Sequence, residues 1–452
     1  MKVPKRNQWI KAGAFSIGSR FSILIFGFGS FYFLIRSLSQ PEFGAWSLFL
    51  GMTAIIEMSK NGLIQNAMIK FLHANPDADS AKVISATWII NLLFSSIIFA
   101  ILISFSGLLS RVFEVPEIEP MFWYYGITLA LLVPYSQFNY IQQSEFSFSG
   151  IFLSSIARQG SFFLAILAIF ILHVKISIVS LVLIQSFCTF IGLIVAFFSA
   201  RSFLTFSFKF DWLMLKNIFQ FGKYVMGTNL CSLFFKNIDQ FSIGYFLNPS
   251  AVALYNSALR LSNLIEYPAT SVAEVVYPHT TTRIHADGES VSRSIYEKSV
   301  GLTLALTVPI VIVTFLFSDF IIYIIAGPKY AASAEILRVT ILFGLITPFN
   351  RQFGVTMDSS GRPQLNFGLL VFGLIVNIIN NIIFIKLFGL IGAAYGTLLS
   401  YLIISIAGHF ILVRLFNIKF RNIFACMITY YQQGFNFVLE LGRKKTGAYD
   451  KK

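Results

Sequence analysis

Seven basic side chains lie inside long apolar stretches of the sequence: Arg20, Lys60, Arg158, Lys236, Arg260, Arg338 and Arg351. Three of them, Arg20, Arg158 and Arg260, lie deep within their stretches and have no carboxylate three or four residues away, the spacing at which a helix brings side chains together. A charge in the middle of a bilayer costs about 2.5–3.5 kcal/mol, so these arginines are expected to face water. A guanidinium fork matches phosphate oxygens, which predicts a phosphate-bearing anionic ligand.

Polar residues form stripes on two consecutive apolar stretches, which are joined by the turn Asn248-Pro249-Ser250. The first stripe holds Asn229, Ser232, Lys236 and Asp239, and the second holds Asn256, Arg260, Asn263, Tyr267, Thr270 and Glu274. Their spacing of three or four residues places each set on one helix face. Such a face in a membrane is expected to meet a cavity or another helix rather than lipid, and we interpret this pair as lining a water-filled chamber. The candidate binding residues are therefore Arg20, Lys60, Arg158, Lys236, Arg260, Arg351, Asn229 and Asn263.

Acidic residues near these bases leave a second interpretation open. Lys60 could pair with Glu57 and Lys236 with Asp239, each three residues apart, as salt bridges without a function. Glu57, Asp239 and Glu274 could instead take up a proton or Na⁺ in a coupled cycle. Arg338 lies near the start of its stretch, where its side chain can extend to the membrane surface.

Composition indicates an integral membrane protein. Of the 452 residues, 56% are hydrophobic and 12% are charged, against about 25% charged in soluble chains. The net charge of +14 is better explained by cytoplasmic loops and an anionic substrate than by nucleic acid. The five histidines lack metal-ligand spacing, so neither a metal nor a cofactor is expected.

Apolar stretches long enough to cross a bilayer predict an all-α polytopic protein of about twelve spans. They cover residues 10–36, 42–70, 82–108, 121–142, 151–172, 176–199, 217–247, 251–278, 298–318, 331–357, 364–386 and 389–414. This gives an N-terminal lobe at 1–200, a cytoplasmic linker at 201–216, a C-terminal lobe at 217–414 and a basic tail at 415–452. Within the tail, 420–441 is expected to be an interfacial helix, with a thirteenth span as the alternative.

Basic residues of the loops lie mainly on the side of the N terminus. The opposite side holds only Arg36, Arg111, Lys175, Lys329 and Lys386. Cytoplasmic loops of membrane proteins carry the excess of Lys and Arg, so both termini are expected in the cytoplasm.

The two halves of the sequence repeat. The turn at 38–42 corresponds to that at 247–250, and Pro134-Tyr135 corresponds to Pro348-Phe349. An offset of six spans returns the chain to the same side, which predicts two parallel six-helix lobes around a central cationic cavity.

Four segments resemble the polysaccharide flippases. They are IRSLSQPEFGAWSLFLGM, IDQFSIGYFLNPSAVALYNSALRLSNLIEYP, IIAGPKYAASAEILRVTILFGLITPF and VNIINNIIFIKLFGLIGAAYGTLLSYL. The resemblance is to the Wzx-like, O-antigen-type members of the multidrug/oligosaccharidyl-lipid/polysaccharide (MOP) exporter superfamily, from about Trp9 to Arg414. It implies translocation of an undecaprenyl-diphosphate-linked oligosaccharide to the outer leaflet of a bacterial inner membrane. It also implies that basic residues at the places of Arg20, Lys60, Lys236 and Arg260 face the diphosphate and sugars, without fixing which of them touches the substrate. The partners that it implies are a polysaccharide polymerase and the chain-length machinery.

Two other functions are weighed against this one. A Na⁺- or H⁺-driven drug or metabolite exporter of the same fold is expected to carry more acids than bases in its cavity, the reverse of the balance here. A membrane glycan polymerase or ligase needs an acceptor site in a large outward loop, and no outward loop carries a carboxylate pair at catalytic spacing. The protein is therefore not expected to be an enzyme.

Overall fold

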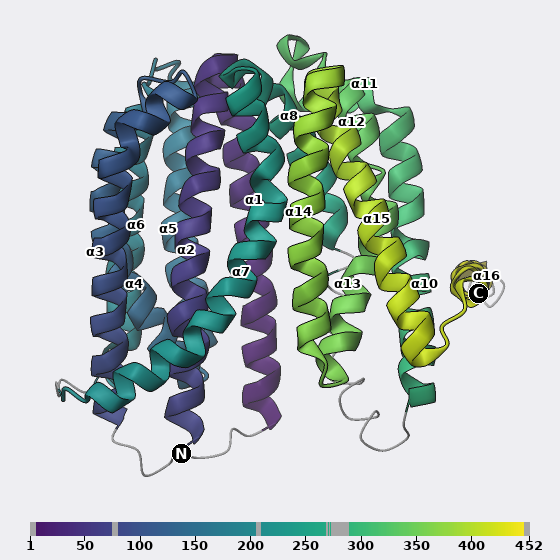
Figure 1. Cartoon of the computed structure of the whole chain (residues 1–452), viewed down its shortest axis with the longest axis horizontal. Helices are drawn as coiled ribbons and strands as arrows, with labels where there is room; N and C mark the ends of the chain where they lie inside the picture. Colours follow the sequence, from purple (N-terminus) through teal and green to yellow (C-terminus); the bar gives the residue numbers. More distant parts are fainter. Residues whose placement is uncertain are drawn as a thin grey trace. The chain divides into compact units, whose positions relative to one another are not determined.

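The computed structural model describes residues 6–74, 80–204, 209–267, 270, 272 and 289–446, and every element in these ranges is helical (Figure 1). Contacts between residues divide the chain into two compact units, Met1–Ala253 and Leu254–Lys452. The predicted all-α architecture is confirmed. The lobe boundary near 200–216 stays a prediction.

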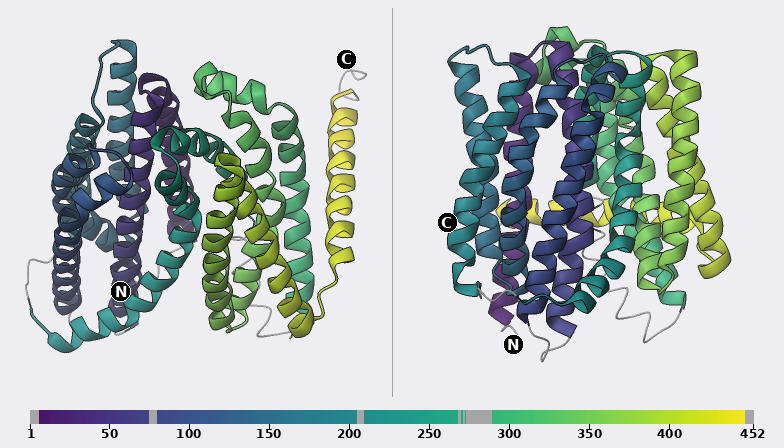
Figure 2. Two further views of the ribbon diagram at one scale, coloured as in Figure 1. Left: turned by 45° about the horizontal axis from the view of Figure 1, so that its top comes forward. Right: turned by 60° about the vertical axis from the view of Figure 1, so that its left-hand side comes forward.

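The first unit is built from long helices that run alongside one another (Figure 2). They are α1 (Arg6–Ser37), α2 (Gln40–Ala74), α3 (Ser80–Val112), α4 (Ile118–Ser144), α5 (Phe148–Ile171), α6 (Ile178–Ala200) and α7 (Trp212–Phe246), with a short 3₁₀ turn η1 (Arg201–Phe203). Helix α8 (Pro249–Ser262) begins in this unit and ends in the next.

The second unit contains the remaining described helices. These are η2 (Asn263–Ile265), α10 (Glu289–Leu316), α11 (Ser318–Ala326), η3 (Pro328–Tyr330), α12 (Ser333–Thr340), α13 (Phe343–Ser359), α14 (Pro363–Phe388), α15 (Leu390–Phe416) and α16 (Phe420–Thr446). The stretch predicted as a single span at 331–357 is divided into α12 and α13.

Side chains at the helix starts supply hydrogen bonds that the helix itself cannot. At the start of α2, Glu42 Oε2 accepts bonds from the backbone nitrogen of Ser39 (2.8 Å) and from its hydroxyl (2.7 Å). Asn248 Oδ1 accepts a bond from the Ala251 nitrogen (2.8 Å) at the start of α8. Both are N-terminal caps, so the turns predicted at 38–42 and 248–250 are confirmed.

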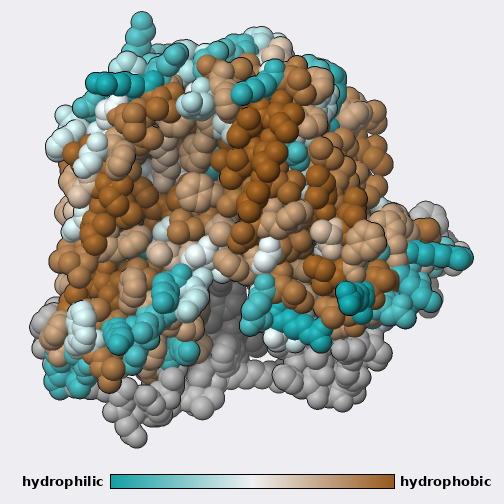
Figure 3. Space-filling model, in the orientation of Figure 1, coloured by the Kyte–Doolittle hydropathy of each residue, from teal (hydrophilic) through white to brown (hydrophobic). Residues whose placement is uncertain are grey.

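Six described helices are long and apolar enough to cross a membrane: α3, α5, α6 with η1, the 293–316 part of α10, α14 and α15. On α3, Leu93, Ile97, Ile101 and Phe105 are exposed at a spacing of four residues. An exposed apolar stripe on a spanning helix suits contact with lipid. Hydrophobic residues cover much of the middle lengths of the helices on the face drawn in Figure 3. The chain is a multi-pass membrane protein, and the count of twelve spans stays a prediction.

Glycines allow α2 and α7 to pack closely along each other. A Cβ added at Gly222 of α7 would collide with the carbonyl oxygen of Leu63 in α2. A Cβ added at Gly62 would lie 3.0 Å from the Met226 Cα. Small residues let membrane helices approach until their backbones touch. Helix α7 is therefore held against α2 within the first unit.

Candidate functional site

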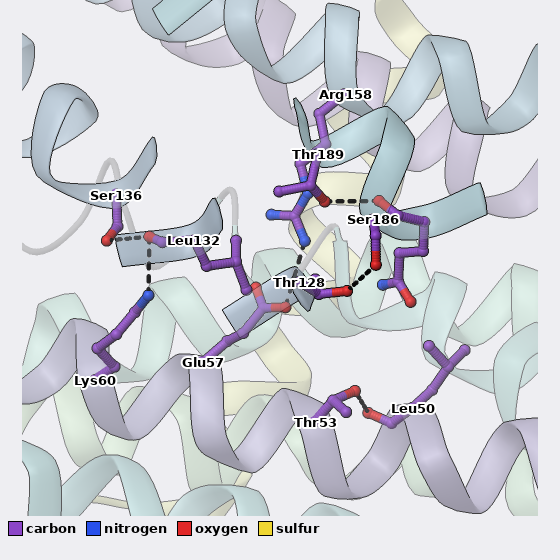
Figure 4. A network of polar contacts seen from close by, with 11 residues as sticks. Leu50, Thr53, Glu57, Lys60, Thr128, Leu132, Ser136, Arg158, Ser186 and Thr189 are labelled. Carbon is purple, nitrogen blue, oxygen red and sulfur yellow. Dashed lines mark hydrogen bonds and ion pairs between the residues drawn. The ribbon is translucent and has the colours of Figure 1, made fainter. Parts of the chain in front are cut away.

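Three charged side chains of the first unit lie near one another where α2 faces α4 and α5 (Figure 4). Arg158 Nη2 in α5 lies 3.3 Å from Glu57 Oε1 in α2, as a hydrogen-bonded ion pair. The side chains of Arg158 and Glu57 are 19% and 29% exposed. They come from helices far apart in the sequence, so the fold creates this pair.

Lys60 lies one turn along α2 from Glu57 and is only 2% exposed. Its ammonium donates a bond to the carbonyl oxygen of Leu132 in α4 (3.1 Å), which also accepts a bond from the Ser136 hydroxyl (2.7 Å; Figure 4). A buried charge is tolerated only with such partners. Glu57, Lys60 and Arg158, named here the charged cluster, carry one net positive charge.

Polar residues at every fourth position of α2 extend the cluster along its contact with α4. After Glu57, Asn61 Oδ1 accepts a bond from the Tyr140 hydroxyl (2.5 Å), and Gln65 Nε2 donates to Gln143 Oε1 (2.6 Å). Interhelical hydrogen bonds of this kind hold membrane helices in register. The charged cluster therefore rests on a fixed α2–α4 frame.

The surroundings of Arg158 come from α4 and α6. The Tyr135 ring centroid lies 5.4 Å from the guanidinium carbon, and a Cβ added at Gly192 of α6 would lie 2.7 Å from Arg158 Cβ. Thr128 and Ser186 join α4 to α6 by a bond of 2.6 Å (Figure 4). Aromatic contact and close helix packing fix the arginine, whose five donors can bind a carboxylate or a phosphate.

Other predicted site residues of the first unit lie on α7. Lys236 is exposed and Asp239 is buried. Asn229 Nδ2 donates to the Met58 carbonyl oxygen of α2 at 3.4 Å. Asn229 of the predicted stripe therefore contacts α2, and the cavity role of the stripe stays a prediction.

The predicted residues of the second unit lie on α8, η2 and α13. Arg260 is half-buried and donates from Nε to Asn256 Oδ1 (3.1 Å). Asn263 and Arg351 are exposed. Glu274 and the side chain of Arg20 lie outside the part of the chain that the structure describes.

Two expectations about pairing differ from the structure. Arg158 has no carboxylate three or four residues away on its own helix, but it pairs with Glu57 on another helix, which a search along one helix does not cover. Glu57 pairs with this arginine, and Lys60 bonds to a backbone carbonyl. Arg338 pairs with the exposed Asp319.

Asn61 and Gln65 were not among the residues predicted for the site. Their four-residue spacing from Glu57 keeps them on one helix face, as the spacing of three or four residues does for the stripe on α7. The same spacing test applied to α2 would have found them. No cluster of three or more His, Cys, Asp or Glu that could hold a metal ion occurs among the described residues.

A family model described as polysaccharide biosynthesis protein matches residues 33–335, which include α2, α4, α5 and the charged cluster. The chain belongs to this family. The match agrees with the resemblance to polysaccharide flippases, because it assigns the chain to a polysaccharide biosynthesis family.

Curated relatives of this family member include proteins named as flippases and transporters. The probable low-salt glycan biosynthesis flippase Agl15 of Haloferax volcanii is 24% identical over 46% of this chain and 44% of its own length. A putative O-antigen transporter of Shigella flexneri is 22% identical over 76% of this chain and 81% of its own. The chain spans less than half the length of the first curated relatives that it matches.

Solved structures of the MOP superfamily share the fold. Lipid II flippase MurJ, in an inward closed conformation, has a TM-score of 0.72 and 14% identity, covering 94% of this chain and 92% of its own. An inward-facing multidrug-resistance MATE transporter has a TM-score of 0.73 and 18% identity, covering 87% of this chain and 95% of its own. At these identities the likeness shows the fold.

Proposed function

We propose that this family member is a flippase for undecaprenyl-diphosphate-linked oligosaccharide repeat units, moving them from the cytoplasmic to the outer leaflet. The match of the polysaccharide biosynthesis family over residues 33–335 carries the proposal. The fold shared with a lipid II flippase over 94% of the chain supports it. The lipid tail would stay in the bilayer while the headgroup crosses between two lobes. Rocking of these lobes would open the cavity between them to one side of the membrane and then to the other.

Basic side chains would compensate the charge of the diphosphate. Arg20, Arg158, Lys236 and Arg260 are the proposed set, with Asn229 and Asn263 bonding sugar hydroxyls. The Glu57–Arg158 pair adds a means of control, because a partly exposed guanidinium can exchange a carboxylate for a phosphate. Glu57 would then neutralise Arg158 until substrate arrives.

We also propose that a gradient of protons or Na⁺ drives this transport. Glu57, Asp239 and Glu274 are the proposed sites for a proton or Na⁺. The alternative function, a Na⁺- or H⁺-coupled exporter of drugs or metabolites, is consistent with the fold shared with a multidrug transporter. Resistance to cationic dyes on overexpression, with normal surface glycan in a deletion strain, would favour that alternative.

A flipping assay with arginine variants tests the charge role. Arg20→Ala and Arg260→Ala are expected to lose most transport of a lipid-diphosphate glycan in proteoliposomes. Arg111→Ala, at the exposed end of α3, removes the same charge outside the proposed site and should retain transport. Full transport by both site variants would refute the proposed role.

Deletion of the gene in its host tests the function itself. Lipid-linked repeat units trapped on the cytoplasmic leaflet, with loss of surface glycan, are the expected result. Unit-length material that reaches the outer face without being joined would instead indicate the polymerase.

A further inference from the structure

The C-terminal helix α16 is packed firmly against α10 within the second unit. A Cβ added at Gly301 of α10 would lie 2.8 Å from Cys426 Cβ and 2.9 Å from the Ile423 carbonyl oxygen. Ile423 itself is fully buried. The two backbones meet at this glycine, so α16 has a defined place beside a candidate membrane span.

A buried carboxylate holds the start of α16. Glu297 of α10, 6% exposed, accepts bonds from the Lys419 backbone nitrogen and from Asn422 Nδ2, both at 2.9 Å. Arg293 Nε also donates to it, at 3.0 Å. A negative charge at a helix N-terminus is favourable because the helix dipole and free N–H groups point toward it.

The described side chains of α16 divide into three faces. At 100° per residue, Ile423, Met427 and Tyr430 lie toward α10 and are at least half-buried. The second face is exposed and apolar, with Phe420, Phe424, Ile428 and Tyr431. The third is exposed and polar, with Thr429, Gln432, Gln433 and Asn436. A helix surrounded by water would expose the apolar second face to solvent. A helix crossing a bilayer would expose the polar third face to lipid.

The direction of α16 differs from that of its neighbours. Figure 1 shows α16 nearly end-on, whereas α10 and α15 run up the page, and the right-hand view of Figure 2 shows α16 lying crosswise to them. Both neighbours are candidate membrane spans, and α16 is not among those found in the described residues. A helix lying across spanning helices runs close to the membrane plane.

Basic residues at the two ends of α16 indicate which kind of surface the helix contacts. Arg414, Lys419 and Arg421 are exposed around its start, and its last turns carry Arg443, Lys444 and Lys445 in the sequence. Basic residues beside an apolar helix face attract anionic phospholipid headgroups. In Figure 3, hydrophobic and hydrophilic residues lie side by side where α16 projects.

We propose that α16 is an in-plane membrane anchor, fastened to α10 by Glu297 and Gly301. Its apolar face lies among the acyl chains, its polar face is in water, and its basic ends bind anionic lipid headgroups. This inference concerns membrane placement and stands apart from the transported substrate.

Spin-label accessibility of the full chain in nanodiscs of phosphatidylcholine and phosphatidylglycerol tests the anchor. Phe424→Cys and Ile428→Cys report on the apolar face, and Thr429→Cys and Gln432→Cys on the polar face, with the native cysteines replaced by alanine. The ratio of oxygen to aqueous nickel accessibility is expected to be several-fold higher at the first two positions. Replacing phosphatidylglycerol by phosphatidylcholine should reduce the burial of positions 424 and 428.

Three results would overturn the proposal. Equal, high nickel accessibility at all four positions would place α16 in water. Spin–spin broadening at 424 and 428 would show a second copy covering the face. Burial unaffected by lipid charge would remove the headgroup role. Should alanine at Cys426 prevent folding, bromolipid quenching of Phe424→Trp against Gln432→Trp in the native cysteine background gives the same comparison.

Discussion

The charged cluster shows how the fold, rather than spacing along one helix, determines the partners of individual charged residues. Glu57 and Arg158 are both partly exposed, yet each neutralises the other across two helices. The basic residues were visible in the sequence because charge is rare in apolar stretches. Their cross-helix partners were not, because sequence spacing reports only on neighbours along one helix.

A double-mutant cycle on this ion pair should show strong coupling. Arg158→Met leaves Glu57 charged among apolar helices and is expected to lower the free energy of unfolding by about 3 kcal/mol. Glu57→Gln combined with Arg158→Met should cost less than Arg158→Met alone. Denaturant unfolding in detergent measures the free energy of unfolding of Arg158→Met, Glu57→Gln and the double variant. Strict additivity of the two single changes would show that the pair does not interact.

Asp211, outside the predicted spans, should make stability depend on acid pH. Its carboxylate caps α7 through the Met214 nitrogen (3.1 Å) and meets Lys82 Nζ (2.9 Å). The Lys82 hydrogen bond, followed by the backbone bond, lowers the pKa of Asp211 from its ordinary 3.8. A lowered pKa in the folded state means that the stabilisation is present above pH 3.8 and is lost as pH falls through the folded-state value.

Thermal unfolding of Asp211→Asn against the native chain checks this dependence. The native chain is expected to melt higher at pH 6, and the difference should shrink as the pH falls below 3.8. A difference that does not change with pH would assign the effect to packing.

At the scale of the elements, the sequence predicted where helices begin but not which helices pack against each other. Turn residues such as Glu42 and Asn248 predicted where helices begin, since capping depends on local chemistry. The close α2–α7 contact could not be predicted, because Gly222 has no local signal that distinguishes it from Gly227. Only the neighbouring Leu63 carbonyl oxygen reveals its role.

The two glycines of α7 therefore form a matched pair for substitution. Gly222→Ala is expected to destabilise the protein, because the added methyl group collides with Leu63. Gly227→Ala meets no atom within 4 Å and should be neutral or stabilising by up to about 1 kcal/mol, the helix propensity difference. Melting temperatures of the two purified variants provide the comparison, and equal melting temperatures would contradict close packing at Gly222.

Docking of α16 can be followed through the thiol of Cys426. Burial, then the Glu297 carboxylate, raises the pKa of this thiol, so its alkylation should be slow. Gly301→Ala forces α16 outward and is expected to accelerate alkylation several-fold. Gly368→Ala, whose methyl group meets no atom within 4 Å, should leave the rate unchanged. Mass spectrometry of the Cys426 peptide measures both, and equal rates would argue against the close crossing.

At the scale of the whole molecule, the distribution of basic residues predicts the orientation. The excess of Lys and Arg in the loops on the side of the N terminus should hold both termini in the cytoplasm. Fluorescent-protein and alkaline-phosphatase fusions at Lys452 should give a fluorescent and an inactive product, respectively. An active phosphatase fusion would reverse the assignment. Sequence predicted this property because it depends on composition, whereas the packing of helices within each unit required the structure.

The wide separation of ion partners has a consequence for synthesis of the chain. Glu57 leaves the ribosome 101 residues before Arg158, so α2 emerges long before the arginine with which its carboxylate pairs. Helix α2 is also absent from the helices apolar enough to span by themselves. Stable integration of α2 is therefore expected to wait until α5 has emerged. A nascent chain arrested after α3 should keep α2 at the insertion machinery, and arrest after α5 should release it to lipid.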